Sequence, residues 1–456
     1  MINSYKLSLR FLTTLLILPI FFSACFKNED NQIPKDLNII LLSVDTLASR
    51  YISSYGSNTQ TPTIDNLAKN GVRFSRTYSV APWTKPAFTS IFSGVYPQTH
   101  SIKRLESKIP DNIPLLAEIM KTSKRQTAAV VSHTLLAPKA GFARGFDFYK
   151  NVNPENPHKA IVAEKVTNTA IDWLNKRDKK QSLFMFLHYF DPHYNYNHHP
   201  SVSKTDSYKG ALKPGTDIRE LRAKMFSFSS TDSQYLRDLY AEEVAYTDAQ
   251  IARLLDYLKQ EGLLDNSLIV FVADHGEEIM ERNWIGHTRN LYNDLISVPF
   301  IIHLPQYIAP KVIDVPVSQV DILPTILDIT KIKSKIPLNG ISLLPALLNK
   351  AELPADRPVY SDVDFQSGRH VKDAFKTSVV RNDYKLIHNR EDNSFELYDV
   401  VKDPEEKQNI AKDNPTIIKE LTDLLLGYEK SEIVTPSQDL SITPKEVKQL
   451  QSLGYM

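Results

Sequence analysis

The sequence is poor in cysteine and carries almost no net charge. Cys25 is the only cysteine among 456 residues, so the chain cannot form an internal disulfide and must take its stability from core packing. The formal net charge of +1 gives no general field that would attract a polyanion or a membrane surface. There is no internal repeat and no low-complexity tract. There is also no nucleic-acid signature, because lysines and arginines are scattered among acids. An anionic substrate must therefore be held by a local site, and nucleic acid is not an expected partner.

The composition is that of a large globular protein. Hydrophobic residues make up 42% of the chain and charged residues 23%, which is enough to bury a sizeable core. The length allows one large domain and a smaller one.

The amino terminus has the parts of a secretory signal. Lys6 and Arg10 precede an apolar stretch from Phe11 to Phe22, which is short of the roughly 20 residues that a membrane-spanning helix needs. Small residues, Ser23 and Ala24, then stand directly before Cys25. In this setting Cys25 resembles the lipidated cysteine of a bacterial lipoprotein; the alternatives are a buried free thiol or an uncleaved anchor helix.

These features predict an exported protein that is lipid-anchored at the bacterial membrane, on its periplasmic or cell-surface side. Residues 1–24 would be the signal peptide. Residues 25–36, which are polar and include Pro34, would be a tether between the lipid on Cys25 and the folded part.

Four apolar runs each adjoin a group that can hold a metal or an oxyanion. Continuous rather than alternating runs of this length indicate strands buried on both faces of a parallel sheet, and such sheets place their ligands at the carboxyl ends of the strands. A single run that ends in Asp can be an ordinary strand exit, but several together indicate a metal site. The runs are Leu37 to Val44 before Asp45, Leu183 to Phe190 before Asp191 and His193, Leu268 to Ala273 before Asp274 and His275, and Val298 to Leu304 after Gly286 and His287.

Helical patterns lie between the strands, which predicts a doubly wound α/β fold with a mostly parallel sheet and helices on both faces. The clearest pattern runs from Leu236 to Leu258 with apolar residues every three or four positions, and it ends near Gly262. The stretch from Asn195 to Ser233 lacks periodicity and predicts a long loop, either covering a substrate or a disordered insertion. Its His198 and His199 are expected to be solvated.

Short strand signals near Val379 and at Tyr384 to His388 and Phe395 to Tyr398 predict antiparallel hairpins, followed by a helix near Thr416 to Leu426. We expect a catalytic domain over residues 37–345 and a small C-terminal α+β subdomain over residues 346–456.

An ordered set of short motifs resembles the sulfatase family of the alkaline phosphatase superfamily. The resemblance covers almost the whole chain after the signal segment and continues into the C-terminal strands. Its motifs are Asp45, Thr61 to Ala68, Gly71 to Phe74, Pro82-Trp83-Thr84-Lys85-Pro86, Ser93 to Pro97 with His100, Gly145 to Asp147, Asp191 to His193, Asp274 to Glu277, Gly286-His287, Val298-Pro299, Asp383 to Ile387, Glu396 to Asp399 and Asp403 to Asn409.

The resemblance implies a hydrolase of sulfate or phosphate esters that holds one or two divalent cations, calcium or zinc, and works through a covalent intermediate. Carried over by position, Thr84 is the nucleophile, with His193 and His287 beside the substrate. A carboxylate-bound cation would lower the pKa of the hydroxyl, and a helix amino end would favour the anionic group. The predicted metal ligands are Asp45, Asp274, His275 and Asp191, and the predicted substrate-binding residues are Lys85, His100 and His133.

Departures from the family pattern modify this prediction. Sulfatases of the typical kind place Cys or Ser where Thr84 stands and Arg where Phe88 stands, and they oxidise that Cys or Ser to formylglycine. The β-branched carbon of threonine cannot give the aldehyde, so no formylglycine is expected and Thr84 must attack with its own hydroxyl. A threonine nucleophile makes a phosphate ester a more favoured substrate here than it is for a typical sulfatase. Sulfatases also carry a lysine-and-histidine pair after the next strand. This pair is absent here, and His133, which stands in that region, is the candidate substitute.

His287 stands where many relatives have a lysine, and an imidazole can bind a metal. Asp191, His193 and His287 are therefore a candidate second cation site. The alternative is a single cation, with His287 donating a hydrogen bond to substrate.

Three functions remain open. The first is an anchored hydrolase of sulfate or phosphate esters on a glycan, a lipid head group or a small molecule. The second is a transferase that passes a phosphoryl-linked head group through a threonine adduct. The third is a catalytically silent binding protein that retains the fold.

Overall fold

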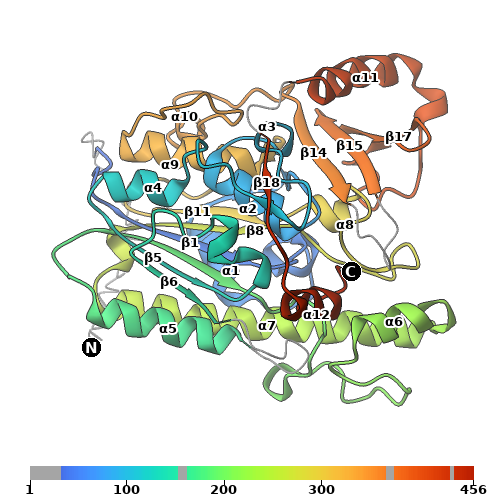
Figure 1. Ribbon diagram of the computed structural model, residues 1–456, viewed down its shortest axis with the longest axis horizontal. Coiled ribbons are helices and arrows are strands. Elements are labelled where there is room, and N and C mark those ends of the chain that lie inside the picture. The colour runs from blue at the N-terminus through green and yellow to red at the C-terminus, as the bar shows by residue number, and fades with distance from the viewer. Residues whose placement is uncertain (1–31, 153–161, 366–373, 432–435, 456) are drawn as a thin grey trace, which may run out of the picture. The chain divides into compact units, whose positions relative to one another are not determined.

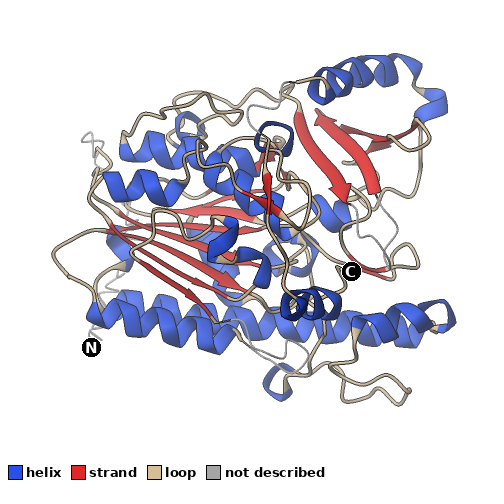
Figure 2. Ribbon diagram, viewed as in Figure 1, coloured by secondary structure: helices blue, strands red, loops and turns tan. Residues whose placement is uncertain are grey.

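A parallel sheet with a single reversed strand forms the centre of the fold. The computed structural model describes residues 32–152, 162–365, 374–431 and 436–455, and the chain from Ile33 onward makes up one unit. The predicted signal segment and Cys25 lie outside the described residues. In Figure 2 the sheet, in red, lies between two layers of helices, in blue. Its strand order is β12 (Lys311–Ile313), β2 (Val72–Phe74), β11 (Phe300–His303), β8 (Ser267–Ala273), β1 (Asn38–Val44), β7 (Leu183–Tyr189), β5 (Gln126–Val131) and β6 (Phe148–Asn151).

The apolar runs form buried strands, as predicted, with one correction. Strands β1, β7 and β8 are fully buried, and alternate residues of β1 face two different cores. The run from Val298 to Leu304 contains β11, which pairs antiparallel with both β8 and β2 and so does not belong to the parallel set. An apolar run records burial but not strand direction, and β11 reverses because the chain returns beside β8 without a crossover to the far side.

Helices cover both faces of the sheet, as Figure 1 shows. One face carries α1, α5 and the 31-residue α7, and the other carries α2, α4, α9 and α10. The doubly wound α/β prediction is confirmed. The helices are α1 (Pro62–Asn70), α5 (Ala163–Lys176), α7 (Ser230–Gln260), α2 (Thr84–Ser93), α4 (Leu116–Thr122), α9 (Ile322–Thr330) and α10 (Leu344–Leu347).

The C-terminal region contains the expected hairpins. Strands β14 (Val359–Phe365), β15 (Ala374–Arg381), β16 (Tyr384–Asn389) and β17 (Ser394–Asp399) form one antiparallel sheet. Helix α11 (Pro415–Glu429) packs on this sheet through a shared cluster that includes Val379 and Leu425. Strand β14 was not foreseen from the sequence.

The stretch from Asn195 to Ser233 is more ordered than predicted. It contains helix α6 (Ile218–Lys224), and α7 already begins at Ser230. His199 is buried and His198 is partly buried, so the expectation that both are solvated was wrong. Their imidazoles pair with Glu242 and Glu243 of α7 at 2.8 Å, which fixes this stretch to the helix.

Shorter elements complete the unit. Segment Pro444–Ser452 forms helix α12, and β18 (Gln438–Asp439) pairs with β4 (Ser107–Lys108). Among the described residues, no helix is both long and apolar enough to cross a membrane. The remaining elements are α3 (Pro97–His100), α8 (Asn293–Ile296), β3 (Thr77–Tyr78), β9 (Glu278–Ile279), β10 (Ile285–Gly286) and β13 (Val317–Ser318).

Candidate active site

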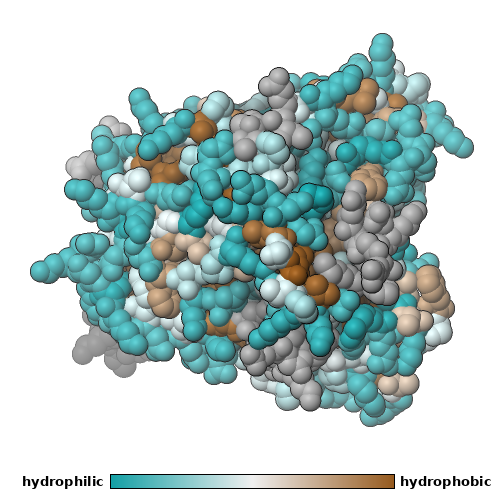
Figure 3. Space-filling model, viewed as in Figure 1, coloured by the Kyte–Doolittle hydropathy of each residue, from teal (hydrophilic) through white to brown (hydrophobic). Residues whose placement is uncertain are grey.

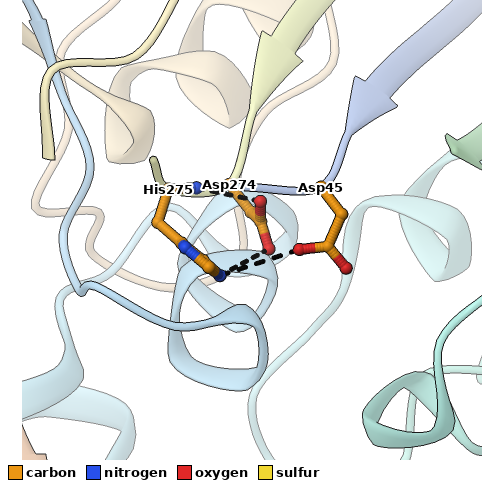
Figure 4. A group of neighbouring side chains, drawn as sticks. All are labelled: Asp45, Asp274 and His275. Atoms are coloured by element: carbon orange, nitrogen blue, oxygen red, sulfur yellow. Dashed lines mark hydrogen bonds and ion pairs between the residues drawn. The ribbon is translucent and has the colours of Figure 1, made fainter. Parts of the chain in front are cut away.

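The carboxyl ends of β1 and β8 bring three predicted metal ligands together. Val44 of β1 is in register with Ala273 of β8, so the residues that follow, Asp45 and Asp274, leave the sheet side by side. The Asp45 amide donates a hydrogen bond to the Tyr189 carbonyl, which continues the ladder beyond the strand end. Figure 4 shows the two carboxylates and the His275 imidazole pointing toward one another.

The imidazole of His275 is oriented so that a nitrogen lone pair faces the carboxylates. Its Nδ1 donates to the Gly276 carbonyl at 2.9 Å, which leaves Nε2 as the acceptor of the neutral ring. Nε2 lies 3.4 Å from Asp274 Oδ2 and 3.7 Å from Asp45 Oδ1. A carbonyl that fixes one nitrogen while the other faces the centre is the usual arrangement of a metal-binding histidine.

This group of side chains fits a divalent cation. One ligand atom from each of Asp45, Asp274 and His275 lies within 4.8 Å of the others, and all three residues are buried. Within the described residues, both Asp45 oxygens and Asp274 Oδ2 have no hydrogen-bond partner. Buried carboxylate oxygens without partners are costly, and a cation held between them would satisfy all three.

Burial also shifts the pKa of each member of the group. Burial raises the pKa of Asp45 well above its ordinary value, and burial together with the nearby Asp45 charge raises the pKa of Asp274 to about 7. Burial lowers the pKa of His275, which keeps the ring neutral. Without a cation, too little positive charge lies near the two carboxyls for both of them to ionise fully.

Thr84 lies beside this group, at the first position of α2. Trp83 before it is extended, with φ −166°, so the chain turns from extended to helical at the threonine. Its Oγ1 lies 3.5 Å from His275 Nε2 and 3.2 Å from the Tyr455 hydroxyl. The amino end of α2 thus faces the carboxylate cluster, where a transferred anionic group would meet free helical N–H groups.

Four further histidines surround the same point. His193 Nδ1 donates to the Tyr194 carbonyl at 2.9 Å, and its Nε2 has no partner within the described part of the chain. His133 accepts from the Leu135 amide through Nδ1, so its proton is on Nε2, 3.8 Å from Asp45 Oδ2. His188 Nε2 lies 3.3 Å from the same oxygen.

His287, the fourth, is held by a carboxylate. Its Nδ1 lies 3.0 Å from Glu277 Oε1, and its Nε2 lies 3.0 Å from the Tyr455 hydroxyl. Its ring centroid is 5.1 Å from that of His193. Burial lowers the pKa of both rings, that of His193 to about 3, so both are neutral.

Asp191 does not join these residues, and the predicted second cation site is therefore not formed. Its carboxylate accepts hydrogen bonds from the backbone amides of Val162, at 3.2 Å, and Ala163, at 2.7 Å. Asp191 thus caps the amino end of α5, a competing use for an aspartate that follows a buried strand. Of the three residues of the candidate second site, His193 and His287 lie close together and Asp191 lies apart from them.

Two of the predicted substrate-binding residues are engaged in the protein itself. The His100 ring lies 3.0 Å from the Ser90 hydroxyl through Nε2 and accepts from the Ile102 amide through Nδ1. The Lys85 ammonium donates to the carbonyl oxygens of Leu105 and Ser107 at 2.5 and 2.8 Å. Burial lowers the pKa of Lys85 to about 7. Both side chains support the loop after α2, and neither is directed at the carboxylates.

Sequence reasoning did not assign a role to His188, Glu277, Tyr194 or Tyr455. His188 could have been found, since it is a polar residue inside an otherwise apolar buried strand. Glu277 follows the Asp-His pair closely enough to be suspected. Tyr194 follows His193 directly, and its hydroxyl lies 3.5 Å from His287 Nε2. Tyr455 belongs to the tail Leu453-Gly454-Tyr455-Met456, which resembles the tail of sulfatase-family chains, but the sequence gives no physical reason for it.

The sequence matches family models and curated proteins over most of its length. The family model described as sulfatase matches residues 37–332, and that described as the C-terminal part of N-sulphoglucosamine sulphohydrolase matches residues 281–431. An N-acetylglucosamine-6-O-sulfatase of Bacteroides thetaiotaomicron is 25% identical, with 87% of each chain covered. An ulvan-active sulfatase of Formosa agariphila is 27% identical over 72% of this chain and 68% of its own.

Solved structures share the fold. A structure in complex with its substrate D-glucosamine-2-N,6-O-disulfate superposes with a TM-score of 0.73 at 24% identity, covering 87% of this chain and 98% of that one. The phosphonate monoester hydrolase of Agrobacterium radiobacter superposes with a TM-score of 0.69 at 20% identity, covering 86% and 95%. Because the sulfatase model matches more than half of the chain, this protein belongs to the sulfatase family of ester hydrolases.

Proposed function

We propose that this protein is a metal-dependent hydrolase of sulfuric or phosphoric esters in which the hydroxyl of Thr84 is the nucleophile. The observation that carries the proposal is the position of Thr84 Oγ1, 3.5 Å from the imidazole nitrogen that also faces Asp45 and Asp274. A hydroxyl at a helix amino end, against two carboxylates and a neutral imidazole, is suited to attack on a tetrahedral anion.

Thr84 acts as an alcohol and not as formylglycine. Its β-carbon carries a methyl group and cannot be oxidised to an aldehyde. Attack therefore forms a bond from Oγ1 to sulfur or phosphorus while the bond to the ester oxygen breaks and the alcohol leaves. Water then attacks the same sulfur or phosphorus and restores the Thr84 hydroxyl. A bound cation supplies the positive charge that lowers the pKa of the hydroxyl and offsets the anionic ester.

Asp45, Asp274 and His275 would hold that cation. Two carboxylates and an imidazole suit zinc or manganese, and calcium if further oxygen ligands come from substrate and water. A single cation is supported better than two, because the Asp191 carboxylate is already used by two backbone amides.

The neutral histidines would transfer protons between the attacking group and the leaving group. His193 Nε2 is buried and has no partner among the described residues; because Nδ1 donates to the Tyr194 carbonyl, Nε2 of the neutral ring is an acceptor that can take a proton at the reacting group. Glu277 fixes the His287 ring through Nδ1, so Nε2 of that ring is directed into the centre. As neutral rings, both offer an acceptor nitrogen, which can take the proton of the attacking group and return it to the leaving alcohol.

The substrate class is a sulfate or phosphate ester on a glycan, a lipid head group or a small molecule. Relatives named N-acetylglucosamine-6-O-sulfatase and Delta 4,5-hexuronate-2-O-sulfatase favour a sulfated sugar. The plain alcohol nucleophile favours phosphorus, and a phosphonate monoester hydrolase shares the fold. We also propose that lipid on Cys25 anchors the enzyme outside the cytoplasm, as the signal-like residues before it suggest.

The test is a panel of aryl sulfates, phosphate monoesters and phosphodiesters, assayed after reconstitution with calcium, zinc or manganese. Thr84→Val removes the hydroxyl and keeps the shape, and is expected to lower kcat by roughly 10³-fold or more. Thr89→Val is the matched control, since Thr89 lies in the same buried helix and its hydroxyl donates to the Lys85 carbonyl. Trapped turnover should give an adduct on the Thr84 peptide.

Activity that survives in Thr84→Val would refute the nucleophile. A wild-type protein that binds metal and turns over no ester would instead support a silent binding protein. Transfer of a phosphoryl-linked head group from lipid to an acceptor alcohol would support the transferase.

A further inference from the structure

The hydroxyl of Tyr455 makes two hydrogen bonds inside the candidate active site. It lies 3.2 Å from Thr84 Oγ1 and 3.0 Å from His287 Nε2, and the residue is fully buried. Its ring also contacts His133 and His193, with ring centroids 6.0 and 6.3 Å apart. Tyr455 is thus surrounded by the residues that the proposed chemistry uses.

The direction of these hydrogen bonds follows from the donors and acceptors available. A neutral His287 that donates from Nδ1 to Glu277 can only accept at Nε2, so the Tyr455 hydroxyl donates to it. The Tyr455 oxygen is then left as an acceptor, and Thr84 donates its hydroxyl proton to that oxygen. The lone pairs of Thr84 Oγ1 are thereby turned toward His275 and the carboxylates.

The backbone that delivers Tyr455 is fitted closely to its place. Gly454 has φ +67°, and a Cβ there would lie 2.8 Å from Arg222 Nη1 and 3.2 Å from the Tyr194 hydroxyl. Arg222 of α6 donates from Nη1 to the Gly454 carbonyl and from Nε to the Ile285 carbonyl, both at 2.9 Å. One guanidinium therefore links the segment before Tyr455 to the strand that precedes His287.

Side chains of α12, and of Leu453 directly after it, also pack this segment against the protein. Leu450 and Leu453 are buried in one cluster with Trp83, the residue before Thr84. Glu446 pairs with Lys139 at 2.5 Å. Figure 3 shows an apolar patch, in brown, on the face where the connection from β18 to α12 runs in Figure 1. The segment is therefore packed on the protein next to Trp83 and tied to Lys139.

We propose that Tyr455 is a positioning residue of the active site, which orients the Thr84 hydroxyl for attack and ties it to His287. The proposal rests on the proposed function of Thr84 and extends it to a residue to which the sequence assigned no role. Without the phenol, the Thr84 hydroxyl is free to rotate and its productive orientation is less populated.

The test is Tyr455→Phe, which removes one oxygen and keeps the ring. We expect kcat to fall roughly 10- to 100-fold, the cost of losing one buried hydrogen bond that is needed in the transition state. KM should stay within about twofold, since the binding of the ester is untouched. Metal uptake and Tm should match those of the wild type. Tyr428→Phe is the matched control, a buried tyrosine of the same cluster whose ring packs on Tyr96 and Tyr360.

A crystal structure of Tyr455→Phe gives a second readout that does not depend on turnover. The Thr84 side chain is expected to show a changed or mixed χ1 rotamer, while His275 and both carboxylates keep their places. An unchanged kcat, or a single unaltered Thr84 rotamer, overturns the role of Tyr455.

Gly454→Ala provides an independent variant in case the phenylalanine protein does not fold. Alanine is strained at φ +67°, and its Cβ would displace the Arg222 guanidinium that binds the Gly454 carbonyl, so the segment that carries the phenol loses its support and kcat should fall with Tyr455 intact; unchanged kcat overturns the proposal. A wild-type protein without any ester turnover refutes the proposed function itself, whereas turnover that persists in Tyr455→Phe refutes only the role of the tyrosine.

Discussion

Replacing Asp45 by Asn separates the metal-binding role of this side chain from its structural role. Burial raises the pKa of Asp45 well above its ordinary value, so the metal-free protein favours the protonated carboxyl more than water does. Asparagine has nearly the same shape and charge as a protonated aspartic acid. The metal-free Tm of Asp45→Asn should therefore stay within about 1 °C of the wild type, as for a substitution that breaks no packing.

The two proteins should differ once a cation is added. A cation at a hundred times its dissociation constant stabilises the folded state by about 2.7 kcal/mol. The unfolding entropy of the unit from Ile33 onward is roughly 0.9 kcal/mol/K, from about 2.1 cal/mol/K per residue, so the wild-type Tm should rise by about 3 °C. If Asn weakens binding about a hundredfold, the same concentration gives about 0.4 kcal/mol and less than about 0.5 °C.

The assay is a thermal unfolding scan of chelator-treated protein titrated with calcium, zinc or manganese. Asp248→Asn is a suitable control, because that buried carboxylate accepts hydrogen bonds from the Thr63 and Ile64 amides at the start of α1. It should lower Tm but leave the cation-induced rise intact. A full rise in Asp45→Asn, or no rise of the wild type with any of the three cations, would refute the metal site.

Two further predictions concern stability. Burial acts to lower the pKa of His199, but the hydrogen bond and charge of Glu243 raise it above its ordinary value of 6.5; the stabilisation is therefore full below pH 6.5 and is lost as pH rises through the folded pKa. His199→Gln should be less stable than the wild type at pH 6, by Tm, and the gap should narrow in alkaline buffer; a constant gap would contradict this pairing. A Cβ at Gly340 would lie 1.9 Å from the Val320 carbonyl oxygen, so Gly340→Ala should cost about 2 kcal/mol in urea unfolding. Gly427→Ala, in α11 with nothing within 4 Å, should cost nothing, and equal losses in both would contradict the packing argument.

The strands and the metal group could be predicted because their signals are local. A continuous apolar run records burial on both faces, and the residue after it must leave the sheet at the ligand-binding edge. Asp45 and Asp274 follow from this alone. The direction of β11 could not be predicted, since an apolar run reads the same in a parallel and an antiparallel strand.

Other parts of the site were hidden because one sequence signal serves two physical purposes. Asp191 follows a buried strand as Asp45 does, yet its carboxylate is used by the amino end of α5. His198 and His199 lie in an aperiodic stretch, but their burial depends on two glutamates of α7 that only the folded chain brings near. Tyr455 depends wholly on long-range packing, for which no periodicity or spacing gives a signal.

The hydrogen bond between Thr84 and Tyr455 joins residues 371 positions apart, and under the proposed role of Tyr455 this separation sets when the chain can first become fully active. At a translation rate of about 5–20 residues per second, roughly 20–70 s separate the synthesis of the two residues. During that interval the chain already contains Asp45, and later Asp274, but the proposed nucleophile, Thr84, lacks the phenol that would orient it. A nascent or prematurely ended chain would therefore carry a poorly oriented alcohol, and full reactivity would arise only as the final helix docks.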